Sequence, residues 1–379
     1  MHTITFYPVG NGDTSQIVLA NGKRILFDFR HLTASEAGDT PEINLKERLR
    51  KELKDVGRDY FDVVAFTHGD DDHIANSTEF FELTHADKYK GGDRIKIREL
   101  WVPAAMVLET AENHQQQAEF VIWRQEARHR LREKRGIRIF SRPDKLKAWM
   151  EKNDLDFEER RHLITDAGQL ANGFSLAADG VEFFCHSPFV KHVDGGDVAR
   201  NEASLIFNVR FNVSNRVWDF LAVGDTEAEV LAEIVSITKA HGREDRLKWD
   251  LFNVPHHCSY LALSQDKGEK ETIPIPLVKE LLLLGKEGAR IISSSLPIDD
   301  EPASYTQVQP PHIQAKKAYD RHLKDVKGGR IHVTMEHKGR KKPEPITFKV
   351  DAEGITLTGE IISGAAAIIT TPAPRAGNE

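Results

Sequence analysis

The residues best suited to chemistry lie at positions 66–76, FTHGDDDHIAN, where three consecutive aspartates stand between two histidines. In an extended loop alternate side chains point the same way, so His68, Asp70 and Asp72 can converge while Gly69 permits a tight turn. Carboxylates packed this closely repel one another, and divalent cations cancel that repulsion. The segment therefore predicts a metal site. The alternative is an acidic helix cap with two incidental histidines.

Two later segments end apolar runs in residues of the same kind. In LAVGDTE (221–227) an apolar run leads to Asp225. In FNVPHHCS (252–259) an apolar run leads to His256 and His257. A lone Gly-Asp pair is usually a turn, and a lone pair of histidines usually lies on the surface, so the joint occurrence carries the inference. Together with His73, which closes the aspartate run, these residues predict one site at the ends of several strands, where layered α/β folds commonly place their sites.

The elements that must position these residues alternate between strands and helices. The first thirty residues read as short strands, with GNGD (10–13) as the first connection and an Asn-Gly turn as the second. A polar helix near 42–55 leads into the apolar run FDVVAF (61–66), and the aspartate run follows directly. Further strands and helices continue to about residue 358. We therefore expect an α/β fold.

Residues 105–170 are polar and helical in pattern, and we expect them to form a helical insertion that is partly basic. Nine Lys and Arg stand against three acids between positions 124 and 145. This stretch is either a solvated charged helix or a patch that follows a phosphate backbone. In the second case Arg128, Arg132 and Arg135 would bind the substrate.

Composition limits the remaining classes. The chain has 379 residues and a net charge of −7, so no overall positive field would draw it to nucleic acid or to anionic membranes. Its two cysteines argue against a disulfide framework, and no apolar stretch approaches the ~18 residues needed to cross a bilayer. We expect a cytoplasmic protein with no membrane partner and a disordered tail over 363–379.

The motifs, taken together, resemble the metallo-β-lactamase fold, and within it the soluble hydrolase domain of ComEC-type DNA-uptake proteins and its stand-alone relatives. That group has the patterns VGxGD, ILIDxG, HxDxDH, NxxSLVL, GD and PHHGS. The matching segments of this chain are PVGNGD (8–13), ILFDFR (25–30), HGDDDH (68–73), NEASLIF (201–207), GD (224–225) and PHHCS (255–259). The resemblance implies a single hydrolase domain over 1–358, an αββα sandwich interrupted by the insertion.

The resemblance also implies a pair of divalent metal ions, Zn²⁺ or Mn²⁺, with Mg²⁺ as a further option. The implied ligands are His68 and Asp70 for one metal, Asp72, His73 and His257 for the other, and Asp225 as a bridge. Asn201 stands where the family supplies a further ligand to the first metal, and Arg30 stands where it has glycine. Asp28 matches an aspartate that orients a ligand. Asp71 is expected to point away and to act as a cap or supporting group.

Such a site suits hydrolysis, because paired cations lower the pKa of a bound water and hold phosphoryl oxygens. Asp70 replaces the second histidine of the lactamases, which argues against a β-lactamase and favours anionic phosphodiesters. The expected catalytic residues are Asp72, His256 and His312, the histidines as phosphate contacts or proton donors. The chain is therefore expected to be a phosphodiesterase or nuclease. The alternatives are a hydrolase of a small phosphoester or cyclic nucleotide, and a non-catalytic binding protein on the same fold.

Overall fold

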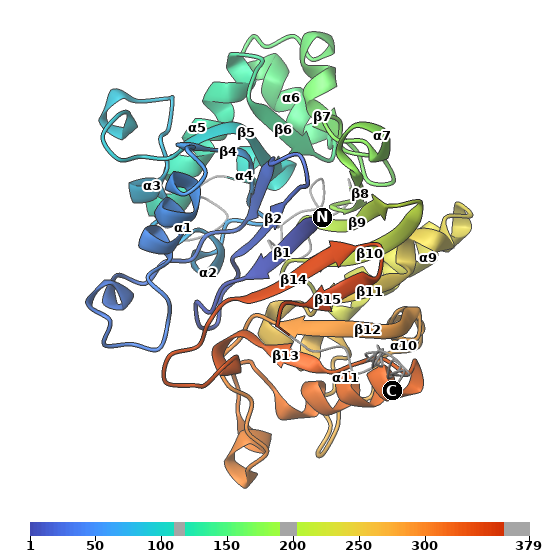
Figure 1. The fold of residues 1–379 in the computed structure, drawn as a ribbon. Coiled ribbons are helices and arrows are strands. Elements are labelled where there is room, and N and C mark those ends of the chain that lie inside the picture. Colours follow the sequence, from blue (N-terminus) through green and yellow to red (C-terminus); the bar gives the residue numbers. More distant parts are fainter. Residues whose placement is uncertain (110–117, 190–202, 360–379) are drawn as a thin grey trace, which may run out of the picture.

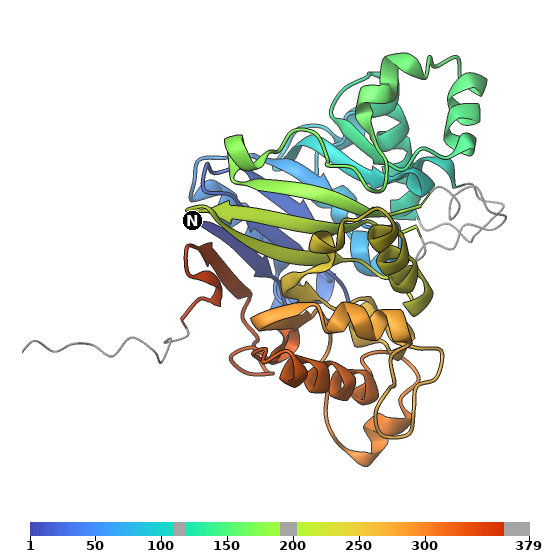
Figure 2. The same cartoon turned by 90° about the vertical axis from the view of Figure 1, so that its right-hand side faces the viewer.

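The computed structural model describes residues 1–109, 118–189 and 203–359. Two β-sheets pack face to face, and helices cover their outer faces (Figure 1; Figure 2). Asn201 and the predicted tail 363–379 lie outside the described residues. Within the described ranges, no helix is both long and apolar enough to span a membrane.

The first sheet has the strand order β15-β14-β1-β2-β3-β4-β5-β6-β7 over the described ranges. Its strands are β1 (His2–Phe6), β2 (Ser15–Val18), β3 (Arg24–Phe27), β4 (Tyr60–Ala65), β5 (Lys96–Pro103), β6 (Ile137–Phe140), β7 (Ile164–Thr165), β14 (Ile346–Asp351) and β15 (Gly354–Leu357). Each pair from β3 to β7 is parallel, and the remaining pairs are antiparallel. The carboxyl ends of β3 to β7 therefore share one edge of the sheet.

The second sheet has the strand order β13-β12-β11-β10-β9-β8. Its strands are β8 (Val181–Ser187), β9 (Ile206–Val213), β10 (Arg216–Val223), β11 (Trp249–Asn253), β12 (Gly285–Ser293) and β13 (Ile331–Val333). The pairs from β10 to β13 are parallel. The carboxyl ends of β10 and β11 thus lie side by side, as the motifs at Asp225 and His257 require.

A continuous apolar core lies between the sheets. Trp101 of β5 meets Phe183 of β8 and Phe207 of β9, with ring centroids 5.3 Å and 5.8 Å apart. Along β4 the side chains alternate, so Val63 enters this core while Val64 packs under the helices on the outer face. The run FDVVAF carries apolar residues on both faces from Val63 onward because both faces of β4 are covered there.

The helices form the two outer layers. Those beside the first sheet are α1 (Leu45–Lys54), α2 (Asp71–Ile74), α3 (Ser77–Phe80), α4 (Ala104–Leu108), α5 (Ala118–Arg132) and α6 (Asp144–Lys152). Those on the second sheet are α9 (Ala228–Ala240), α10 (Pro276–Leu282) and α11 (Ile313–Asp325), while α7 (Leu176–Asp179) precedes β8. Short 3₁₀ turns are η1 (Thr33–Ala37), η2 (Asp87–Tyr89), η3 (Glu158–Leu163), η4 (Glu244–Leu247), η5 (His256–Cys258), η6 (Tyr260–Ala262), η7 (Pro302–Thr306) and η8 (Thr334–Glu336). The predicted αββα sandwich is confirmed.

The segment 105–170 differs in part from the predicted helical insertion. It contains α5 and α6, but β6 and β7 are strands that continue the first sheet beyond β5. Ile137 and Ile139 enter the outer core, and Phe140 enters the core between the sheets. The basic residues around this short apolar run conceal its alternation, which explains the helical prediction.

The basic stretch 124–145 does not form one exposed face. Arg124, Arg130 and Arg138 are buried. Arg130 Nε donates to Glu126 Oε1 at 2.6 Å, and Arg138 Nη2 lies 3.2 Å from Glu99 Oε1. These arginines therefore stabilise the packing of α5 and β6, and they are not available to follow a phosphate backbone.

The first turn of α5 packs directly on the aspartate loop. A Cβ added at Gly69 would lie 2.3 Å from Cδ2 of Phe120, closer than carbon atoms can approach. Glycine is thus required at position 69 because the Phe120 ring occupies the space of a side chain.

We expect Gly69→Ala to cost about 1–3 kcal/mol of unfolding free energy, since either the ring or the loop must move. Phe120→Ala alone should cost about 3–5 kcal/mol through the cavity that it leaves. The double variant should cost at least about 0.5 kcal/mol less than the sum, because the clash is gone. Urea unfolding of the four proteins measures this coupling. Additive costs would contradict the contact.

Candidate metal centre

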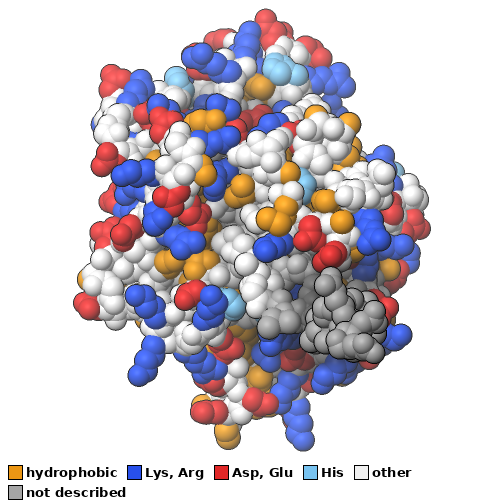
Figure 3. Space-filling view, in the orientation of Figure 1, with side chains coloured by type: hydrophobic (Ala, Val, Ile, Leu, Met, Phe, Trp, Pro, Cys, Tyr) orange, Lys and Arg blue, Asp and Glu red, His pale blue; other side chains and the backbone are white. Residues whose placement is uncertain are grey.

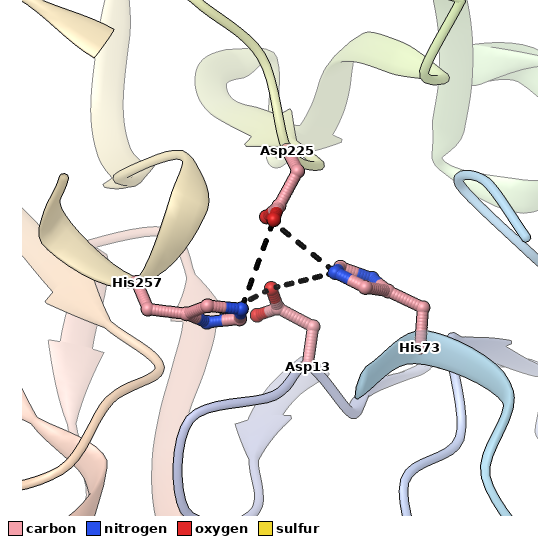
Figure 4. Close-up of side chains that lie close together, drawn as sticks. All are labelled: Asp13, His73, Asp225 and His257. Atoms are coloured by element: carbon pink, nitrogen blue, oxygen red, sulfur yellow. Dashed lines mark ion pairs between the residues drawn. The ribbon is translucent and has the colours of Figure 1, made fainter. Parts of the chain in front are cut away.

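Four buried side chains from separate parts of the chain point toward a common centre (Figure 4). Asp13 follows β1, His73 lies on α2 after β4, Asp225 follows β10 and His257 follows β11. Counted as whole residues, all four are at most 8% exposed. The centre thus lies where strand ends of the two sheets meet, as the sequence predicts.

The distances in this cluster suit ligands around a cation. His73 Nε2 lies 3.4 Å from Asp225 Oδ1 and 3.9 Å from Asp13 Oδ2. His257 Nε2 lies 3.8 Å from Asp225 Oδ2 and 2.9 Å from Asp72 Oδ2. Asp225 therefore stands between the two imidazoles, the place that the predicted bridging role requires.

Hydrogen bonds behind the cluster orient both imidazoles. His73 Nδ1 donates to Asp28 Oδ2 at 2.8 Å, and His257 Nδ1 donates to the backbone oxygen of Ser294 at 2.8 Å. Asp28 is itself held by Thr67, whose backbone N–H and hydroxyl each donate to it at 2.7 Å. Because carboxylate and carbonyl oxygens only accept, Nδ1 carries the proton of each neutral ring, and Nε2 is the nitrogen that could bind a cation.

A second group adjoins the first through His73. His68, Asp72 and His73 also have ligand atoms close enough to share an ion. His68 Nε2 lies 3.5 Å from Asp70 Oδ2, and Asp70 is the residue that precedes α2. The structure therefore brings His68, Asp72, His73, Asp225 and His257 together in two neighbouring groups, and Asp70 lies beside His68 outside both.

The backbone that carries His257 has an unusual conformation. His256, His257 and Cys258 have φ angles of 51°, 52° and 66°, in the left-handed region that favours glycine. This conformation costs roughly 1–2 kcal/mol for each residue with a Cβ. The motif that this segment resembles has glycine at position 258, so the sequence difference falls on a residue with a left-handed backbone. The turn aims His257 into the cluster and directs the backbone N–H of His256 to Asp225 Oδ1 at 3.1 Å.

The charged groups of the cluster and their burial shift one another's pKa values. Burial disfavours protonation of His257, but Asp225, Asp72 and Asp13 outweigh it and raise its pKa to about 9. Burial also disfavours protonation of His73, but Asp28, Asp72 and Asp225 outweigh burial and raise the pKa of His73 well above the usual value. Burial raises the pKa of Asp13, against the opposing effect of His257 and His73. The cluster thus holds more acid than its two imidazoles neutralise.

These residues fit a divalent cation. Nε2 of His68 and Nε2 of His73 are buried and have no hydrogen-bond partner among the described residues, although a buried polar atom normally has one. In each ring the other nitrogen is engaged, since Nδ1 of His73 contacts Asp28 and Nδ1 of His68 lies 3.2 Å from the hydroxyl of Thr67. Imidazole nitrogens and carboxylate oxygens are ligands of Zn²⁺, Mn²⁺ and Fe²⁺. A cation would satisfy the orphaned nitrogens and the excess negative charge together.

The other predicted catalytic histidines differ in position. His256 lies beside the cluster, with Nε2 3.8 Å from Asp225 Oδ2, and its buried Nδ1 has no hydrogen-bond partner in the part of the chain that the structure describes. His312 is buried, its Nε2 lies 3.2 Å from the oxygen of Val308, and its Nδ1 accepts from the N–H of Tyr260. Both ring nitrogens of His312 are therefore engaged away from the cluster, and a catalytic role for it receives no support.

The predicted substrate arginines lie along α5 rather than at the cluster. Arg128 Nε donates to the oxygen of Val107, and Arg132 and Arg135 follow further along or beyond the helix. The contact with the aspartate loop is at Phe120, and twelve residues of helix place Arg132 about 18 Å from it. The structure does not bring these arginines to the site.

The remaining predicted residues have the following places. Asp71 is exposed in the first turn of α2, consistent with a carboxylate that points away from the centre. His186, a further histidine near the end of β8, is buried against Arg246 and Thr238, and burial lowers its pKa to about 4. It is outside both groups of potential ligands.

Sequence reasoning missed Asp13. The residue ends the motif PVGNGD, and the signal was present, because it is an acid at a strand end like Asp225. The loop lies close against the metal loop: the N–H of Asp13 donates to the oxygen of Asp72 at 3.1 Å. A Cβ at Gly12 would lie 1.9 Å from Cδ of Arg30, so the side chain of Arg30 packs directly against this loop.

No protein-family model matches the chain, and no curated protein matches it. Solved structures similar to it include a diphosphatase from the PhnP family, 11% identical, with 91% of this chain and 97% of that chain covered and a TM-score of 0.33. A long form RNase Z from yeast is 13% identical, with 91% of this chain and 41% of that chain covered and a TM-score of 0.42.

The metallo-β-lactamase GOB-18 from Elizabethkingia meningoseptica is also 13% identical, with 85% of this chain and 86% of that chain covered and a TM-score of 0.30. These likenesses concern the fold, and at such TM-scores they carry no conclusion about activity. The metallo-β-lactamase type of αββα sandwich rests on the two-sheet architecture described above. The closer resemblance to ComEC-type hydrolase domains stays a prediction.

We expect Asp28→Asn to weaken metal binding about 10- to 100-fold, because the amide no longer fixes the tautomer of His73 by its charge. Equilibrium dialysis of the chelator-treated protein against Mn²⁺ or Zn²⁺ measures this. Asp62→Asn, which removes a partly buried carboxylate on β4 outside the cluster, is the matched control. Equal affinity in Asp28→Asn and the wild type would contradict the orienting role.

Proposed function

We propose that the chain is a metal-dependent hydrolase whose substrates are phosphodiesters. The observation that supports this most is the buried cluster of carboxylates and imidazoles with orphaned Nε2 atoms. His68, Asp70, Asp72, His73, Asp225 and His257 are the residues that would hold the metal ions. Structural metal sites are closed by protein ligands, whereas catalytic sites keep a position open to substrate, and the partly exposed Asp72 and His256 border this centre.

Divalent cations would supply a water of lowered pKa and electrostatic stabilisation of phosphoryl oxygens. The chain's own residues supply the remaining requirements. Asp28 and the oxygen of Ser294 fix the two imidazoles, so the ligand atoms are positioned before substrate arrives. Asp72 is only partly buried, so the centre opens to solvent on its side.

His256 is the proposed proton donor to the leaving oxygen. Its side chain is 25% exposed, and its Nε2 lies 3.8 Å from Asp225 Oδ2. Its backbone N–H is fixed on the same carboxylate, so the imidazole has a defined position at the rim. Nδ1 is buried and has no hydrogen-bond partner among the described residues, so Nε2 is the nitrogen that we propose delivers the proton.

The substrate is a phosphodiester, and a small one is favoured over a long polymer. On the face seen in Figure 3, basic and acidic side chains are interspersed rather than gathered into a basic groove. Arg124, Arg130 and Arg138 are buried, and the net charge is −7. A nuclease remains the second candidate because the anionic centre would serve a nucleic-acid phosphate equally well.

We expect the protein loaded with Mn²⁺ or Zn²⁺ to hydrolyse bis-p-nitrophenyl phosphate, and chelation to abolish this activity. His73→Ala should lower kcat/KM at least about 100-fold, since both ligand groups share this residue. Labelled DNA and RNA, assayed in parallel, separate a nuclease from a hydrolase of small diesters. The absence of turnover on every phosphodiester by a metal-loaded protein would contradict the proposal.

A second prediction concerns His256 alone. His256→Gln should lower kcat by about 10²–10⁴-fold on a dinucleotide, whose leaving alkoxide needs a proton. The same variant should retain most activity on bis-p-nitrophenyl phosphate, because nitrophenolate leaves without protonation. His241→Gln, an exposed histidine on the outer layer, is the control. Equal losses on both substrates would contradict a proton-donor role.

A further inference from the structure

The aspartate after β1 lies in the centre itself, not behind it. Asp13 Oδ2 is 3.9 Å from Nε2 of His73 and 3.8 Å from Nδ1 of His257. Its side chain is 12% exposed, and its ligand oxygen belongs to the same group as those of Asp225 and the two imidazoles. Figure 4 shows the carboxylate pointing toward the imidazoles from the side opposite Asp225.

No contact in the described chain explains this carboxylate as a structural group. His257 Nδ1 already donates to the oxygen of Ser294 at 2.8 Å, so its 3.8 Å approach to Asp13 is not a hydrogen bond. His73 Nδ1 is likewise engaged by Asp28. His73 Nε2 has no hydrogen-bond partner among the described residues either, and it faces Asp13 Oδ2 at 3.9 Å, a separation that a cation held by both atoms would fill.

Asp13 changes the number and the type of the ligand groups around the centre. Without it, the groups around His257 are two carboxylates and two imidazoles, a number that suits tetrahedral Zn²⁺. With it, three carboxylates face two imidazoles, which exceeds four ligands and is rich in oxygen. Ions that take five or six ligands and prefer oxygen, such as Mn²⁺, fit this set better than Zn²⁺.

We infer that Asp13 is a direct ligand of the metal centre and that its carboxylate sets the preference for an oxygen-preferring ion such as Mn²⁺ over Zn²⁺. The inference rests on the proposed metal-dependent function and names the cofactor class that this function uses. The loop is built to hold the carboxylate there. The N–H of Asp13 donates to the oxygen of Asp72, and Gly12 allows the close approach to Arg30.

The test measures metal affinity without substrate. Chelator-treated wild type, Asp13→Asn and Asp13→His are each dialysed against Mn²⁺ alone and Zn²⁺ alone, and bound metal is quantified by mass spectrometry. Asp13→Asn should lose about 10- to 100-fold in Mn²⁺ affinity and less than about tenfold in Zn²⁺ affinity. Asp13→His should match or exceed wild-type Zn²⁺ affinity while Mn²⁺ binding stays weak, because imidazole is a better ligand of Zn²⁺.

Glu42→Gln is the matched control, since Glu42 lies against the same loop at Gly10 but outside the cluster. It should leave both affinities unchanged. Unaltered Mn²⁺ affinity in Asp13→Asn, or equal losses of both metals in Asp13→Asn and Asp13→His, would overturn the inference. If Asp13→Asn does not fold, the ratio of Mn²⁺ to Zn²⁺ affinity in Asp13→His decides the question by the same criterion.

The outcomes separate this inference from the proposed function. A protein with the expected metal preference but no hydrolysis of any phosphodiester would overturn the function and leave the role of Asp13 intact. Metal-dependent turnover, in a protein whose preference between Mn²⁺ and Zn²⁺ is unchanged in the Asp13 variants, would overturn the role of Asp13 and leave the proposed function intact.

Discussion

Repulsion between buried carboxylates is the constraint on which this structure depends. Asp13, Asp28 and Asp225 are each at most 8% exposed and share one small region with Asp72. Two unit charges 4 Å apart at an effective dielectric constant of 20 repel by about 4 kcal/mol, so a cluster of this kind persists only with opposite charge inside it. Protonated His73 and His257 supply part of that charge in the absence of metal. A divalent cation would supply more and would use the imidazole nitrogens as ligands.

The αββα architecture brings the carboxylates and imidazoles together because strand ends of the two sheets meet at one side of the sandwich. The parallel strands β3 to β7 and β10 to β13 end at the same side, so acids and imidazoles that are distant in sequence converge there. The rigid core around Trp101 fixes the two sheets relative to each other. Irregular backbone is confined to the ends, where the left-handed turn at 256–258 and the tight loops at Gly12 and Gly69 place the ligands.

The sequence predicted the layers and most of the centre because both follow local rules. Apolar runs marked the central strands, and each chemical motif stood directly after one, as with Asp225 after β10. Prediction was wrong where side chains act against their usual preference. Arg124, Arg130 and Arg138 are charged yet buried, because Glu126, Glu99 and backbone oxygens satisfy them, and the strand β6 was hidden among them. Asp13 was overlooked because a Gly-rich turn with an acid is common, and only three-dimensional proximity to His73 distinguishes it.

Anomalous X-ray diffraction from crystals grown with Mn²⁺ tests the central claim most directly. The account predicts a strong peak at the Mn edge, within ligand distance of His73 Nε2, His257 Nε2 and an oxygen of Asp225, with data from chelator-treated crystals showing none. A second peak beside His68 would establish a dinuclear centre. Crystals that show no anomalous peak among these residues, although Mn²⁺ is present in excess, would contradict the account and leave the buried carboxylates to be explained by protonation alone.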